Sequence, residues 1–300
     1  MKKIYIAGCW GMLWQAFYEQ FKNWYELKCT DKDVNEDWLS FLDFRDFEKY
    51  REDVMEFKPN YLFHLWALTD LEYCEQNPDD TLMSNAISVE HAVYIANELD
   101  IPLLYICTAG IFDWKQELYD DWSQPNPGSM YAKWKYYWEL FVKDHAKRYL
   151  ICRAGWMMWG WPRKDKKFIN KIAKQLKEWK KELFIVNDKD WTPTYTHDFA
   201  KNVRLLLEKE YRWLYNMVCG WQTSRLEVTQ EMLKILWLEK DVKITEVDSN
   251  YFAKEYFAPR PWCERLIDKR LTLRGCNIMR DWKIALKEYL ENEYQDLFKK

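Results

Sequence analysis

A tyrosine and a lysine four residues apart are the strongest candidates for chemistry in this chain. Tyr131 and Lys135 fall in a stretch with helical periodicity, and a spacing of four places both side chains on one helix face, one turn apart. An ammonium at that distance lowers the pKa of a phenol, so Tyr131 could exchange a proton with an alcohol or carbonyl oxygen. Pairs of this kind are also common on helix surfaces, where they have no catalytic role.

A hydroxyl residue at the end of an apolar run gives this pair a context. Leu103–Thr108 is typical of a buried strand, and Thr108 stands at its carboxyl end. Doubly wound folds bind ligands beyond the carboxyl ends of their strands, so the Thr108 hydroxyl would hold a substrate oxygen near Tyr131. The sequence therefore predicts a catalytic centre formed by Thr108, Tyr131 and Lys135, although an ordinary loop threonine remains the alternative.

A turn with two glycines after the first apolar run predicts a nucleotide site. Gly8 and Gly11 lie between a predicted strand and a predicted helix, where backbone N–H groups would face the phosphates of a dinucleotide. Asp31 follows the second predicted strand and would accept hydrogen bonds from an adenosine ribose, which favours NAD over NADP. Lys32 beside it would tolerate a 2′-phosphate, and two glycines at this spacing also form plain turns.

Strand and helix patterns alternate through the first half of the chain. Short apolar runs indicate strands at 3–7, 26–30, 61–65, 103–108 and 150–154, and amphipathic stretches indicate helices at 44–57, 79–99 and 131–147. This alternation predicts an α/β fold, a Rossmann-type doubly wound parallel sheet, in residues 1–155. In residues 156–300 we expect a smaller C-terminal α/β substrate domain, with a segment near 190–220 returning to the first domain.

Composition and charge argue against several classes of partner and site. The net charge of −3 gives no electrostatic reason to expect nucleic acid or an anionic membrane as a partner. No apolar run reaches the roughly 18 residues of a membrane span. The eight cysteines form no CxxC pair and the four histidines show no ligand spacing, so we expect no metal. These features predict a cytoplasmic protein with a small-molecule substrate.

With these motifs in place, the chain resembles the extended short-chain dehydrogenase/reductases, and most closely their dTDP-4-dehydrorhamnose reductase branch. The resemblance covers nearly the whole length and rests on the motifs above, together with later ones such as Arg153 to Trp156 and the Arg260-Pro261 step. It implies an NAD(P)H-dependent reduction of a 4-keto nucleotide sugar. In that reaction Tyr131 would protonate the oxygen, Thr108 would orient it and Lys135 would tune Tyr131.

The resemblance also implies further ligand contacts and leaves alternatives open. Ala109-Gly110 replaces the branch's usual Asp-Tyr, which weakens the assignment to rhamnose. A non-catalytic nucleotide-binding regulatory subunit and a nucleotide-sugar epimerase or dehydratase are the other functions, and a homodimer is one open arrangement. The implied cofactor contacts, besides Gly8, Gly11, Asp31 and Lys32, are Met12, Leu13, Asp43, Leu65, Trp66 and Ala67, and the implied substrate contacts are Thr69, Trp156 and Arg260.

Glycine is scarce in this chain and tryptophan abundant, with 8 and 19 residues in 300. Trp14, Trp114 and Trp191 stand where the family usually has glycine, and Trp66 and Trp221 where it has small residues. One hypothesis is a gene whose UGA codons specify glycine in its own code and tryptophan in another; a natural tryptophan-rich variant and engineering are the alternatives. Indoles at turns that need a positive φ would be strained, and Trp14 would overpack its junction, so we expect impaired activity.

Overall fold

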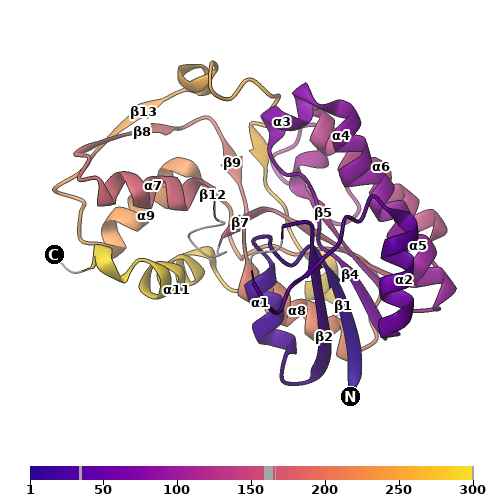
Figure 1. The fold of residues 1–300 in the computed structure, drawn as a ribbon. Helices are drawn as coiled ribbons and strands as arrows, with labels where there is room; N and C mark the ends of the chain where they lie inside the picture. Colours follow the sequence, from indigo (N-terminus) through magenta and orange to yellow (C-terminus); the bar gives the residue numbers. More distant parts are fainter. Residues whose placement is uncertain (34–35, 159–164, 166, 299–300) are drawn as a thin grey trace.

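The computed structural model describes residues 1–33, 36–158, 165 and 167–298. Its first region is built on a seven-stranded sheet with the order β11-β6-β5-β4-β1-β2-β3, in which every neighbouring pair is parallel (Figure 1). The order reverses between β1 and β4, which confirms the predicted doubly wound Rossmann-type sheet. The strands are β1 (Lys2–Ala7), β2 (Tyr25–Asp31), β3 (Ser40–Phe41), β4 (Tyr61–His64), β5 (Leu103–Thr108), β6 (Tyr149–Ala154) and β11 (Trp213–Asn216).

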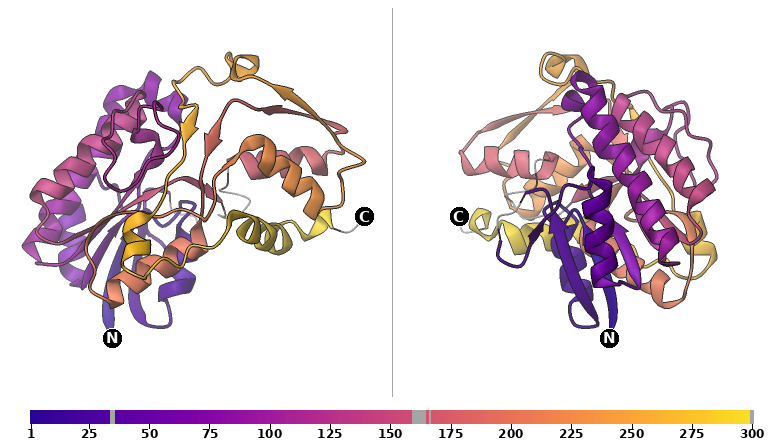
Figure 2. Two further views of the ribbon diagram at one scale, coloured as in Figure 1. Left: turned by 180° about the vertical axis from the view of Figure 1, so that it is seen from behind. Right: turned by 45° about the vertical axis from the view of Figure 1, so that its right-hand side comes forward.

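Helices cover both faces of this sheet because its strands are apolar on both sides. On one face α1 (Trp14–Phe21) packs against α8 (Thr196–Glu208), where Phe17 contacts Phe199. On the other face lie α2 (Phe47–Phe57), α5 (Ser88–Glu98) and α6 (Met130–His145), as Figures 1 and 2 show. Since β11 and α8 come from beyond residue 155, the later part of the chain completes the sheet of the first region.

The single helix expected at 79–99 is interrupted. After α3 (Leu71–Gln76), α4 (Pro78–Leu82) runs into a π-helical turn (Met83–Ile87) before α5 begins. Asn85 lies in that turn; its amide donates to the Leu68 carbonyl over 2.8 Å and its Oδ1 accepts from the Leu68 N–H over 2.7 Å. The extra residue of the π turn thus aims Asn85 at the loop after β4 and fixes that loop beside the sheet edge.

The second region is smaller and mixed. The parallel pair β8 (Glu182–Val186) and β13 (Lys243–Val247) lies beside α7 (Phe168–Lys177), α9 (Arg225–Ile235) and α11 (Trp282–Glu293), on the left in Figure 1. Short strands connect the regions: β7 (Trp156–Met158) with β10 (Pro193–Tyr195), and β9 (Asp190–Trp191) with β12 (Thr223–Ser224) and β14 (Cys263–Glu264). The remaining elements are α10 (Lys269–Leu273) and 3-10 turns at Ala109–Ile111, Ser249–Phe252 and Gln295–Leu297.

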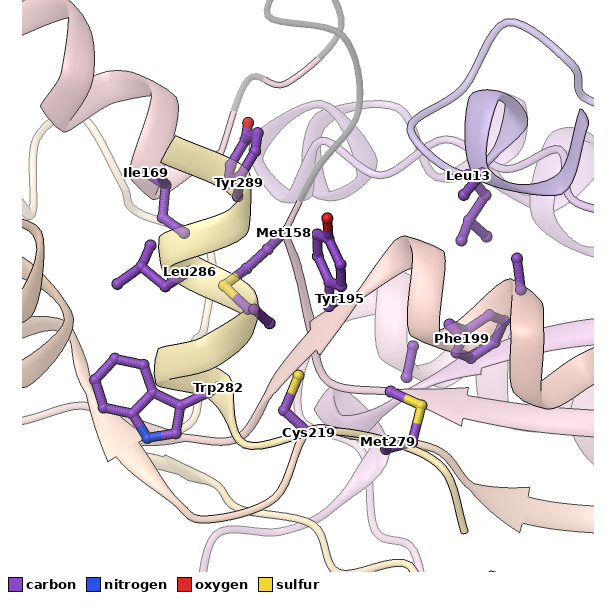
Figure 3. Packing of buried hydrophobic residues seen from close by; sticks show 14 of the residues in the cluster. Leu13, Met158, Ile169, Tyr195, Phe199, Cys219, Met279, Trp282, Leu286 and Tyr289 are labelled. Carbon is purple, nitrogen blue, oxygen red and sulfur yellow. The ribbon is translucent and has the colours of Figure 1, made fainter. Parts of the chain in front are cut away.

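One hydrophobic cluster runs from the first region into the second. Figure 3 shows Leu286 and Tyr289 of α11 beside Ile169 and Met158, while Phe199 of α8 lies towards the sheet. Because the cluster is continuous, it holds the second region firmly against the carboxyl edge of the sheet. Within the described residues, no helix is both long and apolar enough to cross a membrane.

Tryptophan occupies an unusual share of the strained backbone positions. Among the described residues, eight that are not glycine have a positive φ, and five of them are tryptophans, although tryptophan makes up only 19 of 300 residues. The left-handed region favours glycine because a Cβ there is crowded by the backbone. The five are Trp114, Trp179, Trp213, Trp221 and Trp237, with φ of 67°, 61°, 89°, 65° and 55°.

Candidate active site

A cavity opens at the carboxyl ends of β1, β4 and β5, where the second region faces the sheet. Both regions contribute to its walls: Gly8 and Thr108 from the first, and Trp156, Arg225 and Glu264 from the later part of the chain. This is the edge at which a doubly wound sheet binds ligands.

The three catalytic candidates line this one cavity. Thr108 ends β5, and Tyr131 and Lys135 lie one turn apart at the start of α6; all three line the cavity. The Ser129 hydroxyl caps α6 by accepting from the Ala132 N–H over 3.2 Å, which fixes where the helix begins. Thr108 Oγ1 accepts from the Gly110 N–H over 3.2 Å, and the Thr108 hydroxyl also forms a hydrogen bond with the Tyr131 phenol.

The environment of Tyr131 keeps its phenol protonated. Burial raises the pKa of Tyr131, nearby Cys107 and Glu264 raise it further, and the hydrogen bond with Thr108 acts in the opposite direction. A neutral phenol next to a cavity is suited to donating a proton to a ligand oxygen.

Lys135 is itself buried and carries an unfavourable charge. Its ammonium lies 4.2 Å from the centre of the Tyr105 ring, and burial lowers its pKa to about 8. Because the side chain is only 5% exposed, the charged form loses most of its hydration. A group of this kind is retained at a cost in stability, which is typical of functional sites.

Replacing Lys135 should therefore separate stability from activity. Lys135→Met is expected to raise the free energy of unfolding at pH 7 by about 3 kcal/mol, which corresponds to a pKa moving from 10.5 to about 8 on folding, and to lower kcat. Between pH 8 and 10.5 the unfolded parent binds more protons than the folded parent, so the parent gains stability as the pH rises. Thermal unfolding at pH 7 and 10 should show the variant's advantage shrinking, and a constant advantage would contradict this account.

One end of the cavity is suited to a dinucleotide. Gly8 has a φ of 92°, and a Cβ added there would lie 2.4 Å from the Trp66 backbone nitrogen, so only glycine fits beneath the loop after β4. Among the described residues, no acceptor faces the backbone N–H groups of Met12 and Leu13, which precede α1. Free N–H groups at a helix N-terminus bind phosphate. The predicted cofactor residues that line this end are Gly8, Gly11, Met12, Leu13, Leu65 and Ala67.

Four predicted cofactor residues do not line the cavity. Asp31 Oδ2 accepts a hydrogen bond from the Trp10 N–H over 2.8 Å and so holds the backbone of the glycine turn in place. Asp43 pairs with Arg45, which lowers the pKa of the Asp43 carboxyl. The Trp66 ring packs 5.4 Å from the centre of Phe44, and Lys32 is exposed.

Trp14 at the strand–helix junction is half-buried and packs against the hydrophobic core. Its indole stacks on Trp38, with ring centres 4.2 Å apart, and on Tyr18 at 5.3 Å.

The other end of the cavity is cationic. The predicted substrate residues Thr69, Trp156 and Arg260 all line it. Arg260 is held by Glu72 through two hydrogen bonds, from Nη1 to Oε1 over 2.6 Å and from Nη2 to Oε2 over 2.7 Å, so its charge is largely compensated. Lys167, Lys189, Arg225 and Glu264 line the same end and were missed from the sequence.

Arg225 is the best placed of these cations to hold an anionic ligand. Its guanidinium lies 5.8 Å from the ring centres of both Trp156 and Phe168, and among the described residues no acidic side chain pairs with it. No local pattern signals it, because it begins α9 directly after a two-residue strand. Within the described part of the chain, no group of three or more His, Cys, Asp or Glu is arranged to hold a metal ion.

The chain is similar in sequence and in fold to proteins that are already known. The family model described as "RmlD substrate binding domain" matches residues 1–295. A solved dTDP-4-dehydrorhamnose reductase from Clostridium acetobutylicum is 28% identical, with a TM-score of 0.86 over 96% of this chain and 98% of that one. A solved dTDP-4-dehydrorhamnose reductase from Bacillus anthracis in complex with NADP is 24% identical, with a TM-score of 0.86 over 97% and 99%.

A further relative has a different kind of name. Methionine adenosyltransferase 2 subunit beta of Danio rerio is 22% identical over 236 residues, which is 76% of this chain and 72% of that protein. Relatives of this chain thus include proteins named as reductases and proteins named as a subunit of a transferase.

Proposed function

Since the chain belongs to the RmlD substrate binding domain family, we propose that it catalyses the nicotinamide-dependent reduction of a keto group on a nucleotide-linked sugar. The observation that carries this proposal is the meeting of Thr108, Tyr131 and Lys135 in one cavity, between a glycine turn with free N–H groups and a cationic end. A 4-keto-6-deoxyhexose linked to dTDP is the substrate that we propose.

Each residue of the site would have its own role in this reduction. Thr108 and Tyr131 bind the carbonyl oxygen, and the neutral phenol of Tyr131 gives it a proton as the carbonyl carbon is reduced. Lys135 lies one helical turn after Tyr131 and would supply positive potential when the phenol loses its proton. A bound nicotinamide would supply the hydride, and the N–H groups of Met12 and Leu13 are suited to hold its diphosphate.

The substrate would extend from the reacting oxygen towards the cationic end. Trp156 offers an apolar face for the sugar, and Arg225 offers a charge for the substrate's diphosphate. The choice between NADH and NADPH is part of the proposal: Asp31 favours NADH, whereas Lys32 beside it would accept NADPH.

The proposal is tested by following oxidation of NADH and of NADPH with a dTDP-4-keto-6-deoxyhexose. Stoichiometric loss of reduced cofactor together with a reduced sugar product supports it. Interconversion of sugars without net consumption of cofactor would instead identify an epimerase.

A non-catalytic regulatory subunit is the second candidate, and the likeness to a methionine adenosyltransferase subunit favours it. In that case the cavity would bind nucleotide without turnover. Binding of NADPH measured by calorimetry, with no oxidation in the presence of any keto sugar nucleotide, would support this function.

We further propose that the tryptophans at positions where the family usually has glycine reduce the activity of this chain. Trp191 is buried at the substrate end, with its ring centre 4.1 Å from that of Trp156 in an edge-to-face arrangement. An indole at this place fills space that a sugar would otherwise occupy.

A further inference from the structure

An acidic side chain lies next to the catalytic candidates. Glu264 ends the short strand β14 and lines the cavity. A Cβ added to Gly110 would lie 3.3 Å from Glu264 Oε1 and 3.6 Å from Thr108 Oγ1, so both oxygens border the same small space. Glu264 is also near enough to Tyr131 to raise the pKa of the phenol. The carboxylate thus adjoins the place where a reacting oxygen would be held.

This carboxylate has no partner of its own among the described residues. No hydrogen bond or ion pair reaches it, although Arg225, Arg260 and Lys189 are close enough to favour its charged form. Arg260 is held by Glu72, and the Lys189 ammonium donates to the Arg260 carbonyl. The Glu264 side chain is half-buried, and its partial removal from water raises the pKa of the carboxyl. A ligand that covers the carboxylate would therefore need to donate a hydrogen bond to it.

We propose that Glu264 determines substrate specificity by accepting a hydrogen bond from a sugar hydroxyl vicinal to the reacting carbonyl. Thr108 and Tyr131 would hold the carbonyl oxygen, and Glu264 stands on the neighbouring side of the same space, within reach of the next oxygen on the ring. A site that leaves a buried acceptor unpaired rejects an analogue lacking the hydroxyl. This inference rests on the proposed function, and it adds which substituent of the sugar the site recognises.

The experiment compares two substrates in two variants. Glu264→Ala is expected to lower kcat/KM by about 10- to 100-fold for a 4-keto sugar nucleotide that carries the vicinal hydroxyl. For the analogue that lacks this hydroxyl, parent and variant should differ by less than about threefold. Glu264→Gln, which keeps an acceptor, should retain part of the discrimination.

Two outcomes would overturn the proposal. Equal losses on both substrates would indicate a structural role, and a change confined to KM for the nicotinamide cofactor would place Glu264 in the other subsite. If Tyr131→Phe abolishes turnover while Glu264→Ala leaves discrimination unchanged, only this inference fails. If Tyr131→Phe also has no effect, the proposed function fails.

A second inference comes from the ends of five helices, α5, α7, α8, α9 and α10. Each ends in the same turn, in which a residue with positive φ and the residue after it donate to carbonyls of the last helical turn; this Schellman motif normally has glycine at the first position. After α10 that residue is Gly275, after α5 and α8 it is Asp100 and Glu210, and after α7 and α9 it is tryptophan. The bonds after α10, α7 and α9 are Gly275 N to Thr272 O and Cys276 N to Leu271 O, Trp179 N to Leu176 O and Lys180 N to Gln175 O, and Trp237 N to Lys234 O and Leu238 N to Leu233 O.

Three tryptophans with positive φ are largely exposed to solvent. Trp179, Trp221 and Trp237 are 64%, 76% and 77% exposed, which is rare for the largest apolar side chain. Several other indoles are buried, yet their N–H groups have no acceptor among the described residues: Trp114, Trp134, Trp138 and Trp191. Buried indoles normally find an acceptor.

We infer that the native protein carries glycine at Trp114, Trp179, Trp213, Trp221 and Trp237, because its gene has UGA codons that its own host reads as glycine. Trp282 provides the contrast, since it is 3% exposed and packs into the core from α11. A tryptophan is explained there by packing alone.

The codons of the gene test this inference. We expect UGA at the five positions and UGG at Trp282, and mass spectrometry of peptides from the native host should show glycine at the five. UGG at the five positions would overturn the inference, and so would UGA at Trp282 as well, because the gene would then use UGA for ordinary tryptophan.

Discussion

Tyr131→Phe is expected to lower kcat for keto-sugar reduction by about 10²- to 10⁴-fold, the usual contribution of a positioned general acid. The substitution removes only the hydroxyl that forms a hydrogen bond with Thr108 and leaves the ring in place. KM for the cofactor should change by less than about twofold, since the phenol lies beyond the glycine turn. Steady-state oxidation of NADPH with saturating keto sugar nucleotide measures both.

Tyr137→Phe is the matched control for this experiment. Tyr137 lies on the same helix, α6, but is exposed and does not line the cavity. Its loss of a hydroxyl should leave kcat unchanged. Equal rates for Tyr131→Phe and the parent would remove Tyr131 from the mechanism and favour the regulatory function.

Replacing Trp179, Trp221 and Trp237 together by glycine is expected to raise the free energy of unfolding by about 1.5–3 kcal/mol. A left-handed conformation costs a residue with a Cβ about 1–2 kcal/mol, and glycine gives back about 0.5–1 kcal/mol of this through its greater freedom in the unfolded chain. The three positions follow different elements, so their effects should add. Chemical unfolding followed by circular dichroism measures the change.

The same three positions replaced by alanine give the control. Alanine removes the exposed indole but keeps the Cβ, so it should recover little of the stability. If alanine and glycine stabilise the protein equally, the indole rather than the backbone is the source of the effect. A loss of stability with glycine would contradict the strain at these turns.

The central sheet was predictable because its signal is local. Leu103–Thr108 is the strand that the apolar run indicated, and Gly8 and Gly11 lie at the turn where their spacing placed them. Alternating apolar runs and amphipathic stretches leave few topologies for a parallel sheet. The π-helical turn at Met83–Ile87 was missed because the helical periodicity continues through it.

The cationic end of the cavity was not predictable in the same way. Arg225 and Glu264 follow or end strands of two residues, which pair with β9 across long separations in sequence. Such short strands have no periodicity that a sequence could reveal. The positive φ of Trp179 and Trp237 could not be predicted either, because a tryptophan does not mark the end of a helix as a glycine does.

The strand β11 has a consequence for how this molecule unfolds. It forms one edge of the sheet but is supplied from beyond residue 155, as is α8, which covers the sheet together with α1. A fragment cut at residue 155 would expose the backbone of β6 and the apolar side chains beneath α8. We therefore expect the two regions to unfold in a single cooperative transition, and a ligand that binds between them should protect both from denaturation to the same degree.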